Sequence, residues 1–424
     1  MRLTAAVLAV GDELLLGDVV NTNAAWLGGQ LAAAGVQVVA SAVVGDDLAR
    51  LAVALRRALQ DADVVLLSGG LGPTSDDLTR DAVAAVAGVP LERSAALERG
   101  LRERFASYGT GLPAQVLRQA DVPRGARALD NPAGTAPGLW LQVGDRLVVA
   151  LPGPPHELRA VAGPVLEELA RRSGSVVVTR TLHTAGLGEP SVAEIVERAV
   201  RVPDGVALAY LAGGGITRVR FTGSDPSVLE PLATAAAAAL GEAVWGRDQD
   251  TLPGVVHALL RDRSATVGVA ESLTAGLLAD ALAGLPGSSA TFRGGLVVYA
   301  TDLKESLAAV PRPLLQAHGA VSAETAGALA AGARTRLGAS YGVATTGVAG
   351  PDEQEGKPAG TVFVAAAGPD GGAVRALRLP GDRDRVRALA VTAALDLLRR
   401  HLTALSDRPG PPWREDRHPD ARSA

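Results

Sequence analysis

Apolar runs alternate with amphipathic segments through the first 170 or so residues of the chain. Four runs rich in Val, Leu and Ala end at turn-forming residues and are typical of buried strands: residues 3–10, 36–44, 63–70 and 146–153. Apolar positions recur with helical spacing over residues 26–35, 47–62 and 77–88. This alternation indicates parallel strands with helices on both faces. We therefore expect residues 1–172 to form an α/β domain.

The middle of the chain has a different pattern, and a second α/β pattern follows it. Residues 173–248 combine strands with helices, which is typical of a small α+β unit; the strands are 175–186 and 215–223, and the helices 191–200 and 231–244. Residues 249–404 return to the first pattern, with strands at 265–270, 294–300, 341–347 and 360–368 and helices at 251–263, 274–284, 322–337 and 382–402. Residues 405–424, rich in proline and charge, are expected to be a disordered tail. The predicted fold class is α/β, with two three-layer domains joined by the α+β middle domain.

Composition and charge exclude several classes of function. The net charge is −4 and the pI is about 5.9, which argues against direct binding of nucleic acid or of an anionic membrane. The chain has no cysteine, so disulfides, thiol nucleophiles and thiolate metal sites are excluded. Residues 1–10 are better explained as a strand than as a signal peptide. No segment has the roughly 18 uninterrupted apolar residues of a membrane helix, and we expect a cytoplasmic protein.

Two residue types are scarce in this chain. Of 41 basic residues only Lys304 and Lys357 are lysine, and the other 39 are arginine. Asparagine occurs only at Asn21, Asn23 and Asn131. A residue type that the chain otherwise avoids indicates a position where a more common type, such as arginine in place of lysine, could not perform the same role. These five residues therefore become candidates for function.

Ser272 follows the predicted strand 265–270, and Lys304 follows the strand 294–300. Ligands gather at the carboxyl ends of strands in doubly wound sheets. Ser272 or Thr274 could simply cap the next helix, and a lysine in the position of Lys304 could be a solvated surface charge. A desolvated lysine, unlike arginine, can act as a general base, and serine needs a base to become a nucleophile. No histidine lies in these strand-end segments, so a Ser–Lys pair is the economical hypothesis.

The loop after the strand 341–347 contains several glycines and prolines and can expose N–H groups to an anion. Lys357 could add a point charge for a phosphate. Arg383 and Arg387 could hold a phosphate or merely begin a solvated helix. The candidates for substrate contacts in this half are Thr274, Gly276, Thr346, Gly347, Gly350, Lys357, Arg383 and Arg387.

These segments together resemble the CinA C-terminal domain, a family of nicotinamide mononucleotide deamidases. The matching pieces are AESLTAG at 270–276, GGLVVYATDLK at 294–304, GVAGP at 347–351 and KPAGTV at 357–362. The resemblance implies that Ser272 is the nucleophile, Lys304 the base and Tyr299 a neighbour in the site. It implies hydrolysis of nicotinamide mononucleotide to nicotinate mononucleotide and ammonia without a metal or redox cofactor, with N–H groups of the following helix holding the oxyanion. Ala275 and residues 352–355 stand where the family often has glycines.

The segment 68–81, SGGLGPTSDDLTRD, joins a predicted strand to a helix in the N-terminal half. Gly69, Gly70 and Gly72 would let the backbone approach a ligand, and the Thr74 hydroxyl could bond a phosphate. Asp76 and Asp77 beside such a loop make sense if a divalent metal bridges them to the phosphate. The alternative is a glycine-rich turn whose aspartates favour the first turn of the helix.

The N-terminal half resembles the molybdopterin-binding-like domain of CinA proteins. The matching pieces appear in family order: GDELLLG at 11–17, VNTN at 20–23, GGLGPT at 69–74, NPAGTAPG at 131–138 and LPGPPHE at 151–157. The resemblance implies an ADP-ribose pyrophosphatase that depends on a divalent metal held by Asp76 and Asp77, with Asn21, Asn23 and Asn131 among the substrate contacts.

Fold alone cannot determine the ligand of this domain. The N-terminal half could instead be a pterin-binding or nucleotide-binding module without turnover. The family's name refers to competence and DNA damage, yet the acidic balance gives direct DNA binding no support. We expect small nucleotides (nicotinamide mononucleotide and ADP-ribose) as partners, and a homo-oligomer, most simply a dimer.

Overall fold

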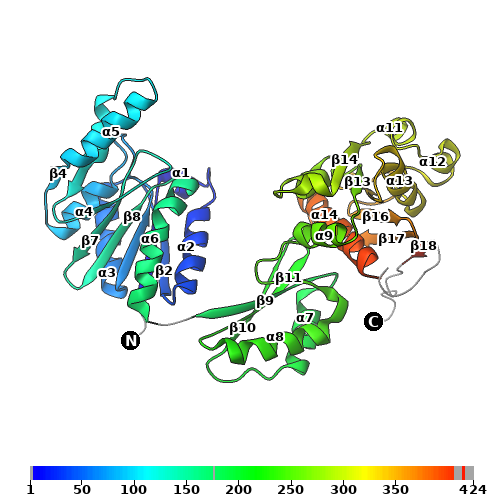
Figure 1. Ribbon diagram of the computed structural model, residues 1–424, viewed down its shortest axis with the longest axis horizontal. Helices are drawn as coiled ribbons and strands as arrows, with labels where there is room; N and C mark the ends of the chain where they lie inside the picture. The colour runs from blue at the N-terminus through cyan, green and yellow to red at the C-terminus, as the bar shows by residue number, and fades with distance from the viewer. Residues whose placement is uncertain (1–2, 175–176, 405–412, 416–424) are drawn as a thin grey trace. The chain divides into compact units, whose positions relative to one another are not determined.

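The computed structural model of the chain describes residues 3–174, 177–404 and 413–415 (Figure 1). It consists of two compact units, one up to Val178 and one from Thr179 onward. The predicted α/β class is confirmed, because each unit contains a six-stranded sheet covered by helices. No helix among the described residues combines the length and apolar character needed to cross a bilayer.

The sheet of the first unit has the strand order β2-β1-β3-β8-β7-β6. Its parallel part consists of β1 (Thr4–Val10), β2 (Gln37–Val44), β3 (Val64–Ser68) and β8 (Arg146–Leu151). An antiparallel edge that the sequence pattern did not predict follows, made of β7 (Gly138–Val143) and β6 (Arg127–Leu129). The four predicted strands are therefore the parallel core, and parallel strands bring their carboxyl ends to one edge.

Helices cover both faces of this sheet, as predicted. Alternate residues of the strands face alternate sides. One set packs against α2 (Thr22–Ala33) and α6 (Pro155–Ser173), and the other against α3 (Leu48–Asp61) and α4 (Thr79–Ala87). The remaining elements of this unit are α1 (Asp12–Leu16), β4 (Leu91–Arg93), α5 (Ala95–Ser107), a 3₁₀ helix (Ala114–Ala120) and β5 (Asp121–Pro123).

The second unit begins with a four-stranded sheet in the order β10-β11-β9-β12, in which β10 pairs antiparallel with β11 and β12 pairs antiparallel with β9. Its strands are β9 (Val178–Ala185), β10 (Ala207–Gly213), β11 (Ile216–Gly223) and β12 (Val244–Arg247). Two helices pack with it, α7 (Glu189–Ala199) and α8 (Pro226–Leu240), and a 3₁₀ turn (Gly241–Ala243) precedes β12.

The large sheet of the second unit has the order β14-β13-β15-β16-β17-β18. Its parallel strands are β13 (Val267–Glu271), β14 (Phe292–Val297) and β15 (Tyr341–Gly347), and β16 (Thr361–Gly368) and β17 (Gly371–Arg378) are antiparallel. The short strand β18 (Trp413–Glu415) runs parallel to β17. It belongs to the segment 405–424 predicted to be disordered, and the rest of that segment lies outside the described residues.

Helices α9 (Leu252–Asp262), α10 (Leu277–Ala283) and α14 (Arg383–Ala404) pack on one face of this sheet, and α13 (Ala323–Arg336) packs on the other. Two short helices, α11 (Thr301–Ser306) and α12 (Arg312–His318), and a 3₁₀ turn (Ser288–Ala290) lie in the connections. The backbone of α13 approaches the sheet closely, because a Cβ atom at Gly342 would collide with the carbonyl oxygen of Ala330.

A buried carboxylate joins α14 to the four-stranded sheet. Asp396 is 1% exposed and accepts hydrogen bonds from Arg399 (3.0 and 2.7 Å) and from Arg400 Nε (2.8 Å). The same two guanidinium groups donate to the carbonyl oxygens of Glu242 (2.8 Å) and Ala185 (3.3 Å). The middle and C-terminal parts of the chain are thus tied within one compact unit.

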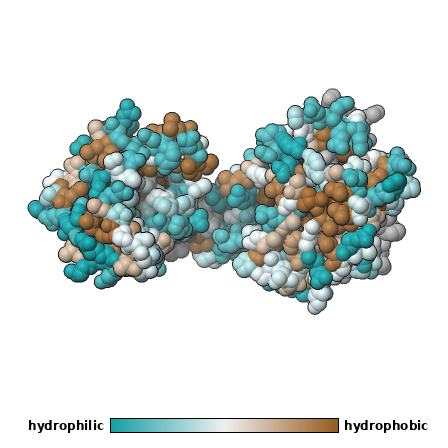
Figure 2. All heavy atoms as spheres, turned by 90° about the horizontal axis from the view of Figure 1, so that it is seen from above, coloured by the Kyte–Doolittle hydropathy of each residue, from teal (hydrophilic) through white to brown (hydrophobic). Residues whose placement is uncertain are grey.

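The surface of the chain mixes polar and apolar residues. On the face seen in Figure 2, hydrophilic residues predominate on both units, and a patch of hydrophobic residues interrupts them on the larger one. The exposed large apolar side chains of the second unit include Leu277, Val297, Tyr299 and Leu307. Tyr299 is 55% exposed although it follows a sheet strand, which indicates an accessible position at the edge of the sheet.

Candidate active site

Ser272 is placed by the end of the central strand β13. Every residue of β13 is buried, and the backbone N–H of Ser272 donates to Thr345 O of β15 (3.0 Å), which continues the parallel pairing by one residue. Tyr299 follows the neighbouring strand β14, and Gly347 ends β15. The three parallel strands therefore bring these residues to one edge of the sheet, as the sequence predicted.

Glu271 determines how the chain leaves β13. Its fully buried carboxylate accepts the N–H groups of Gly276 (3.0 Å), Leu278 (3.0 Å) and Ala279 (2.8 Å) at the beginning of α10. The predicted helix 274–284 consequently begins only at Leu277, with Gly276 as its N-cap in the left-handed region (φ 102°).

Two expectations for this turn are therefore wrong. No side chain of the N-cap position caps α10, so neither Ser272 nor Thr274 is a helix cap. The free N–H groups of the helix do not serve an oxyanion, because the Glu271 carboxylate already accepts them. The physical reason is that a buried carboxylate needs donors, and the first turn of a helix supplies them.

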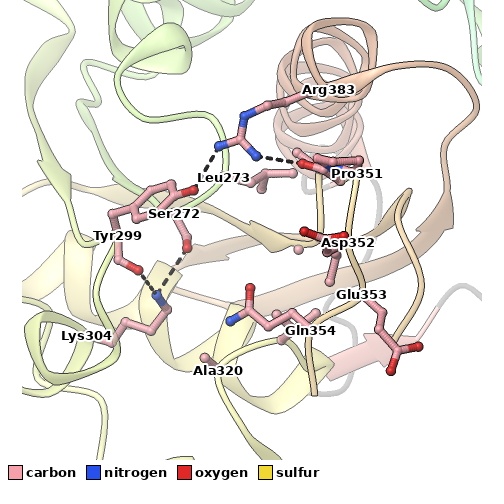
Figure 3. Close-up of a pocket in the computed structure, with 15 residues that line it drawn as sticks. Ser272, Leu273, Tyr299, Lys304, Ala320, Pro351, Asp352, Glu353, Gln354 and Arg383 are labelled. Atoms are coloured by element: carbon pink, nitrogen blue, oxygen red, sulfur yellow. Dashed lines mark hydrogen bonds between the residues drawn. The ribbon is translucent and has the colours of Figure 1, made fainter. Parts of the chain in front are cut away.

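Lys304 lies beside Ser272. The Lys304 side chain is 1% exposed, and its Nζ donates to Ser272 Oγ (3.1 Å) and Tyr299 O (3.1 Å), as Figure 3 shows. It also donates to Val298 O (2.8 Å). The two carbonyl oxygens fix the direction of the amine. The sequence hypothesis required that the serine hydroxyl and this amine meet, and they lie within hydrogen-bonding distance.

Burial lowers the pKa of Lys304 from its ordinary value of 10.5 to about 8. Desolvation is the main cause, because it disfavours the charged ammonium form. The carboxylates of Glu355 and Asp302 act in the opposite direction and raise the pKa. A substantial fraction of Lys304 is therefore neutral near pH 8, and a neutral amine can accept the proton of a hydroxyl.

Tyr299, which lies beside Ser272, and Arg383 form one rim of the site (Figure 3). Arg383 Nη2 donates to the Tyr299 hydroxyl (2.9 Å), and Arg383 Nη1 donates to Gly350 O (2.9 Å). The arginine thus links the residue after β14 to the loop after β15 and leaves its exposed outer face available to an anion.

A pocket of about 390 Å³ opens in front of the Ser–Lys pair. Its walls come from the ends of the parallel strands, from the segment before α13 and from the loop after β15. The lining residues are Ser272, Leu273, Tyr299, Lys304, Ala320, Val321, Gly347, Val348, Ala349, Gly350, Pro351, Asp352, Glu353, Gln354 and Arg383. The backbone N–H groups of Leu273, Ala349 and Gly350 donate to no acceptor within the described part of the chain, so they can serve a ligand.

Several predicted substrate contacts do not line this pocket. The hydroxyl groups of Thr274 and Thr346 are fully buried; the first bonds Thr345 Oγ1 (2.7 Å) and the second donates to Ala320 O (2.7 Å). Arg387 donates to Leu273 O (3.0 Å) and Thr274 O (3.2 Å), so it holds the turn that carries the nucleophile. Gly276 and Lys357 also lie outside the lining, whereas Gly347, Gly350 and Arg383 are part of it.

The sequence reasoning missed the acidic and amide side chains of the loop 352–355. Asp352, Glu353 and Gln354 line the pocket, and Glu355 acts on the pKa of Lys304. The one sequence signal for these residues was that residues 352–355 are polar where the family often has glycines. A run of polar residues in a loop usually indicates only a solvated surface, so sequence could not assign these residues.

A second pocket, of about 410 Å³, lies at the carboxyl edge of the sheet in the first unit. Gly69 and Gly70 have φ values of 103° and 67°, and a Cβ atom at Gly69 would collide with Val10 O. Asn23 Nδ2 donates to Ser68 Oγ (3.0 Å) and Gly153 O (2.7 Å), which ties α2 to the strand ends. The predicted residues Asn21, Asn23, Gly69, Gly70, Gly72 and Asp77 all line this pocket.

Three of the predicted N-terminal residues have structural contacts instead. Asn21 lines the pocket but uses its side-chain oxygen to cap α2 at Ala24 N–H (3.0 Å). Asn131 is 4% exposed, bonds Ala136 O (2.8 Å) and Glu157 (2.6 Å), and lines a separate pocket beside α5. The Thr74 hydroxyl donates to Asp77 and does not line the second pocket.

The predicted metal ligands differ in their availability. Asp77 accepts the N–H groups of Gly72 (2.8 Å) and Thr74 (2.8 Å) in addition to the Thr74 hydroxyl, so its carboxylate shapes the loop. The Asp76 side chain, by contrast, is exposed. Within the described residues no group of three or more His, Asp or Glu side chains is arranged to hold a metal.

The fold and its pockets define a two-unit α/β protein with a glycine-rich pocket in its N-terminal half and a buried Ser–Lys pair in its C-terminal half. Residues 249–402 match the family model of the CinA C-terminal domain, and residues 6–172 match the model described as "Probable molybdopterin binding domain". The chain belongs to the CinA family.

Curated relatives match this chain over almost its whole length. A CinA-like protein of Frankia casuarinae is 53% identical over 419 residues, which cover 95% of this chain and 96% of the relative. A CinA-like protein of Anaeromyxobacter sp. is 42% identical over 406 residues, 94% of this chain and 99% of the relative. The crystal structure of the protein CinA from Thermoplasma acidophilum is 39% identical and covers 39% of this chain and 98% of its own, with a TM-score of 0.37.

Proposed function

We propose that the C-terminal half of this chain hydrolyses the carboxamide of nicotinamide mononucleotide to nicotinate mononucleotide and ammonia. The observation that carries the proposal is the buried amine of Lys304, 3.1 Å from the Ser272 hydroxyl and with a pKa lowered to about 8. The resemblance to the CinA deamidases supplies the substrate, and the pocket in front of the pair supplies the space for it.

In the proposed mechanism the neutral Lys304 amine takes the proton of Ser272 Oγ as this oxygen attacks the carboxamide carbon. The Leu273 N–H, which directly follows the nucleophile and is unpaired within the described residues, is the donor proposed for the oxyanion. Lys304 then returns its proton to the leaving nitrogen, and ammonia departs from the acyl-enzyme. Water, deprotonated by the same amine, hydrolyses the ester, so that Ser272 regains its proton and the acid is released.

The rate of ammonia release is expected to rise with pH through the pKa of Lys304. Because the amine must be neutral, kcat/KM should fall about tenfold per pH unit well below pH 8 and level off above about pH 9. The measurement is kcat/KM for ammonia release from nicotinamide mononucleotide between pH 6 and pH 9.5. A profile that is flat over this range would exclude Lys304 as the base.

For the N-terminal half we propose hydrolysis of ADP-ribose to AMP and ribose 5-phosphate in the presence of a divalent metal. The glycine-rich loop beside a pocket of about 410 Å³ suits a pyrophosphate, because its backbone can approach the ligand. Mg²⁺ usually binds through one or two carboxylates together with substrate phosphates and water. Asp77 lines the pocket, but its carboxylate already accepts the donors of its own loop. We therefore assign the metal to Asp76, whose exposed carboxylate lies outside the pocket lining.

This second activity predicts different outcomes for the two neighbouring aspartates. Asp76→Asn should lose AMP formation while leaving the unfolding temperature of the first unit unchanged, because the Asp76 side chain is exposed. Asp77→Asn should lower both activity and stability, since its carboxylate orders the loop. AMP formation with and without added Mg²⁺, combined with calorimetric unfolding, separates the two effects. Equal activity of Asp76→Asn and wild type would contradict the proposed role of Asp76.

The alternative for this half is a pterin-binding module without turnover, and the description of its family model favours it. Isothermal titration of the full chain with molybdopterin and with ADP-ribose tests the alternative. Tight binding of the pterin, with no AMP formed from ADP-ribose in the presence of Mg²⁺, would replace the pyrophosphatase proposal.

A further inference from the structure

The loop after β15 ends in a tight turn over residues 354–357. The N–H of Gln354 donates to Lys357 O (3.0 Å), and the N–H of Lys357 donates to Gln354 O (2.9 Å). The two central residues, Glu355 and Gly356, have φ values of 53° and 68°. Positive φ at both central positions is the conformation of a type I′ turn, which is compact and well defined. The turn therefore fixes the direction in which the side chain of Gln354 leaves the backbone.

Glu355 attaches this turn to the opposite wall of the pocket. Its carboxylate accepts the N–H groups of Ala320 (2.9 Å) and Val321 (3.1 Å), both of which line the pocket. Gly319 has a φ of 77°, and a Cβ atom there would collide with the Glu355 carboxylate. The wall itself is held from the sheet side, because Thr346 Oγ1 donates to Ala320 O (2.7 Å). We name the two Glu355 hydrogen bonds the Glu355 clamp.

The clamp presents the side chain of Gln354 to the reacting groups. In Figure 3 this side chain extends from the loop into the pocket, and its amide is directed toward Ser272 and Lys304. Neither its oxygen nor its nitrogen bonds another group within the described part of the chain. A free amide, held by a rigid turn and facing the nucleophile, is available to the group that the nucleophile attacks.

We propose that Gln354, held by the Glu355 clamp, is a specificity-determining residue that pairs with the carboxamide of the substrate. This inference rests on the proposed deamidase function. A primary amide offers an acceptor and two donors in one plane, so a glutamine and a carboxamide can exchange two hydrogen bonds. The carboxylate of the product is acceptor-only and can use only the N–H of Gln354. Gln354 therefore favours binding of the amide and release of the acid.

The test compares the affinities of substrate and product in a background that cannot react. In full-length Ser272→Ala protein, isothermal titration should give a lower Kd for nicotinamide mononucleotide than for nicotinate mononucleotide. Adding Gln354→Met keeps the length of the side chain and removes its amide. The ratio of the acid Kd to the amide Kd should then fall several-fold, as expected for the loss of a hydrogen bond from an exposed side chain. An unchanged ratio would overturn the proposal.

The clamp is tested with a matched pair of glutamines. Glu355→Gln retains one acceptor oxygen but loses the carboxylate, whereas Glu324→Gln removes a 48% exposed carboxylate from the first turn of α13, close to the same wall. Glu355→Gln should speed hydrogen exchange at the Ala320 and Val321 amides. It should also raise KM, and the fold increase in KM should be several times larger than the fold decrease in kcat. Glu324→Gln should change neither quantity. Equal exchange rates at these amides in both variants would contradict the clamp.

Failure of this inference can be distinguished from failure of the deamidase proposal. If wild-type protein releases no ammonia and the Ser272→Ala protein binds neither nucleotide, the proposed function is wrong. If wild type releases ammonia while Gln354→Met leaves the Kd ratio unchanged, only the role of Gln354 is wrong. The hydrogen-exchange measurement needs no substrate and reports on the Glu355 clamp in either case.

Discussion

Replacing Lys304 by arginine should lower kcat for ammonia release by about 10³-fold or more. The guanidinium group stays protonated at every accessible pH, so it cannot take the proton of Ser272. Losing a general base costs roughly 10² to 10⁴ in rate. Because the Lys304 side chain is only 1% exposed, bulk water cannot easily take over its role as the base. Ammonia release from nicotinamide mononucleotide by the purified full-length variant is the measurement.

The chain provides its own matched control for this experiment. Lys357→Arg exchanges the only other lysine, which lies outside the pocket lining, and should retain nearly full activity. Lys304→Met, which has similar length and no charge, should be as inactive as Lys304→Arg and guards against misfolding caused by the larger arginine. Circular dichroism and the unfolding temperature verify the fold. Activity of Lys304→Arg within tenfold of wild type would remove the Ser–Lys mechanism.

Replacing Asp396 by alanine should destabilise the second unit by about 3–5 kcal/mol, the usual cost of leaving a buried charge without its partner. Asp396 is 1% exposed, and the Arg399 side chain that it pairs with is 7% exposed. Calorimetry of the full-length chain should show the transition of the second unit lowered on the order of 10 °C. The transition of the first unit should not move, because it contributes no residue to this network.

An exposed ion pair in the same unit serves as the comparison for Asp396. Glu194 and Arg198 form an i,i+4 pair in α7 whose side chains are 59% and 78% exposed. Glu194→Ala should cost no more than about 0.5 kcal/mol, because solvent screens exposed pairs. If Asp396→Ala and Glu194→Ala shift the transition equally, the buried network does not hold the middle and C-terminal parts together.

Sequence reasoning predicted the parallel cores of both large sheets, because four to eight consecutive apolar residues bounded by turns indicate strands buried on both faces. It missed the antiparallel edges, such as β7 and β17, and short helices such as α1 and α11. These strands have shorter apolar runs than the parallel strands, and short helices bury little apolar surface, so the sequence pattern of both is weak. Their positions depend on pairing with strands that are distant in the sequence.

The Ser–Lys pair of the C-terminal site could be predicted from the amino-acid composition and from the positions of the two residues after predicted strands. Lys304 could be selected because arginine serves almost everywhere else, and Ser272 because it ends a buried strand. Thr274, Thr346 and Arg387 were natural candidates from their place in the motifs, yet their polar atoms bond the protein itself. Whether a polar atom faces a ligand or a neighbouring strand depends on side-chain direction, which a motif does not contain.

The sequence alone determined the fold class and led to the hypothesis of a Ser–Lys pair, since hydrophobic periodicity and residue chemistry are local properties. Only the tertiary structure decided that Glu271 takes the donors of α10, that Glu355 reaches Ala320 and Val321, and that Asp396 joins α14 to the preceding sheet. In the last two cases the linked residues lie 34 to 215 positions apart along the chain. Such contacts form when packing excludes water from both partners, and burial is a property of the folded chain.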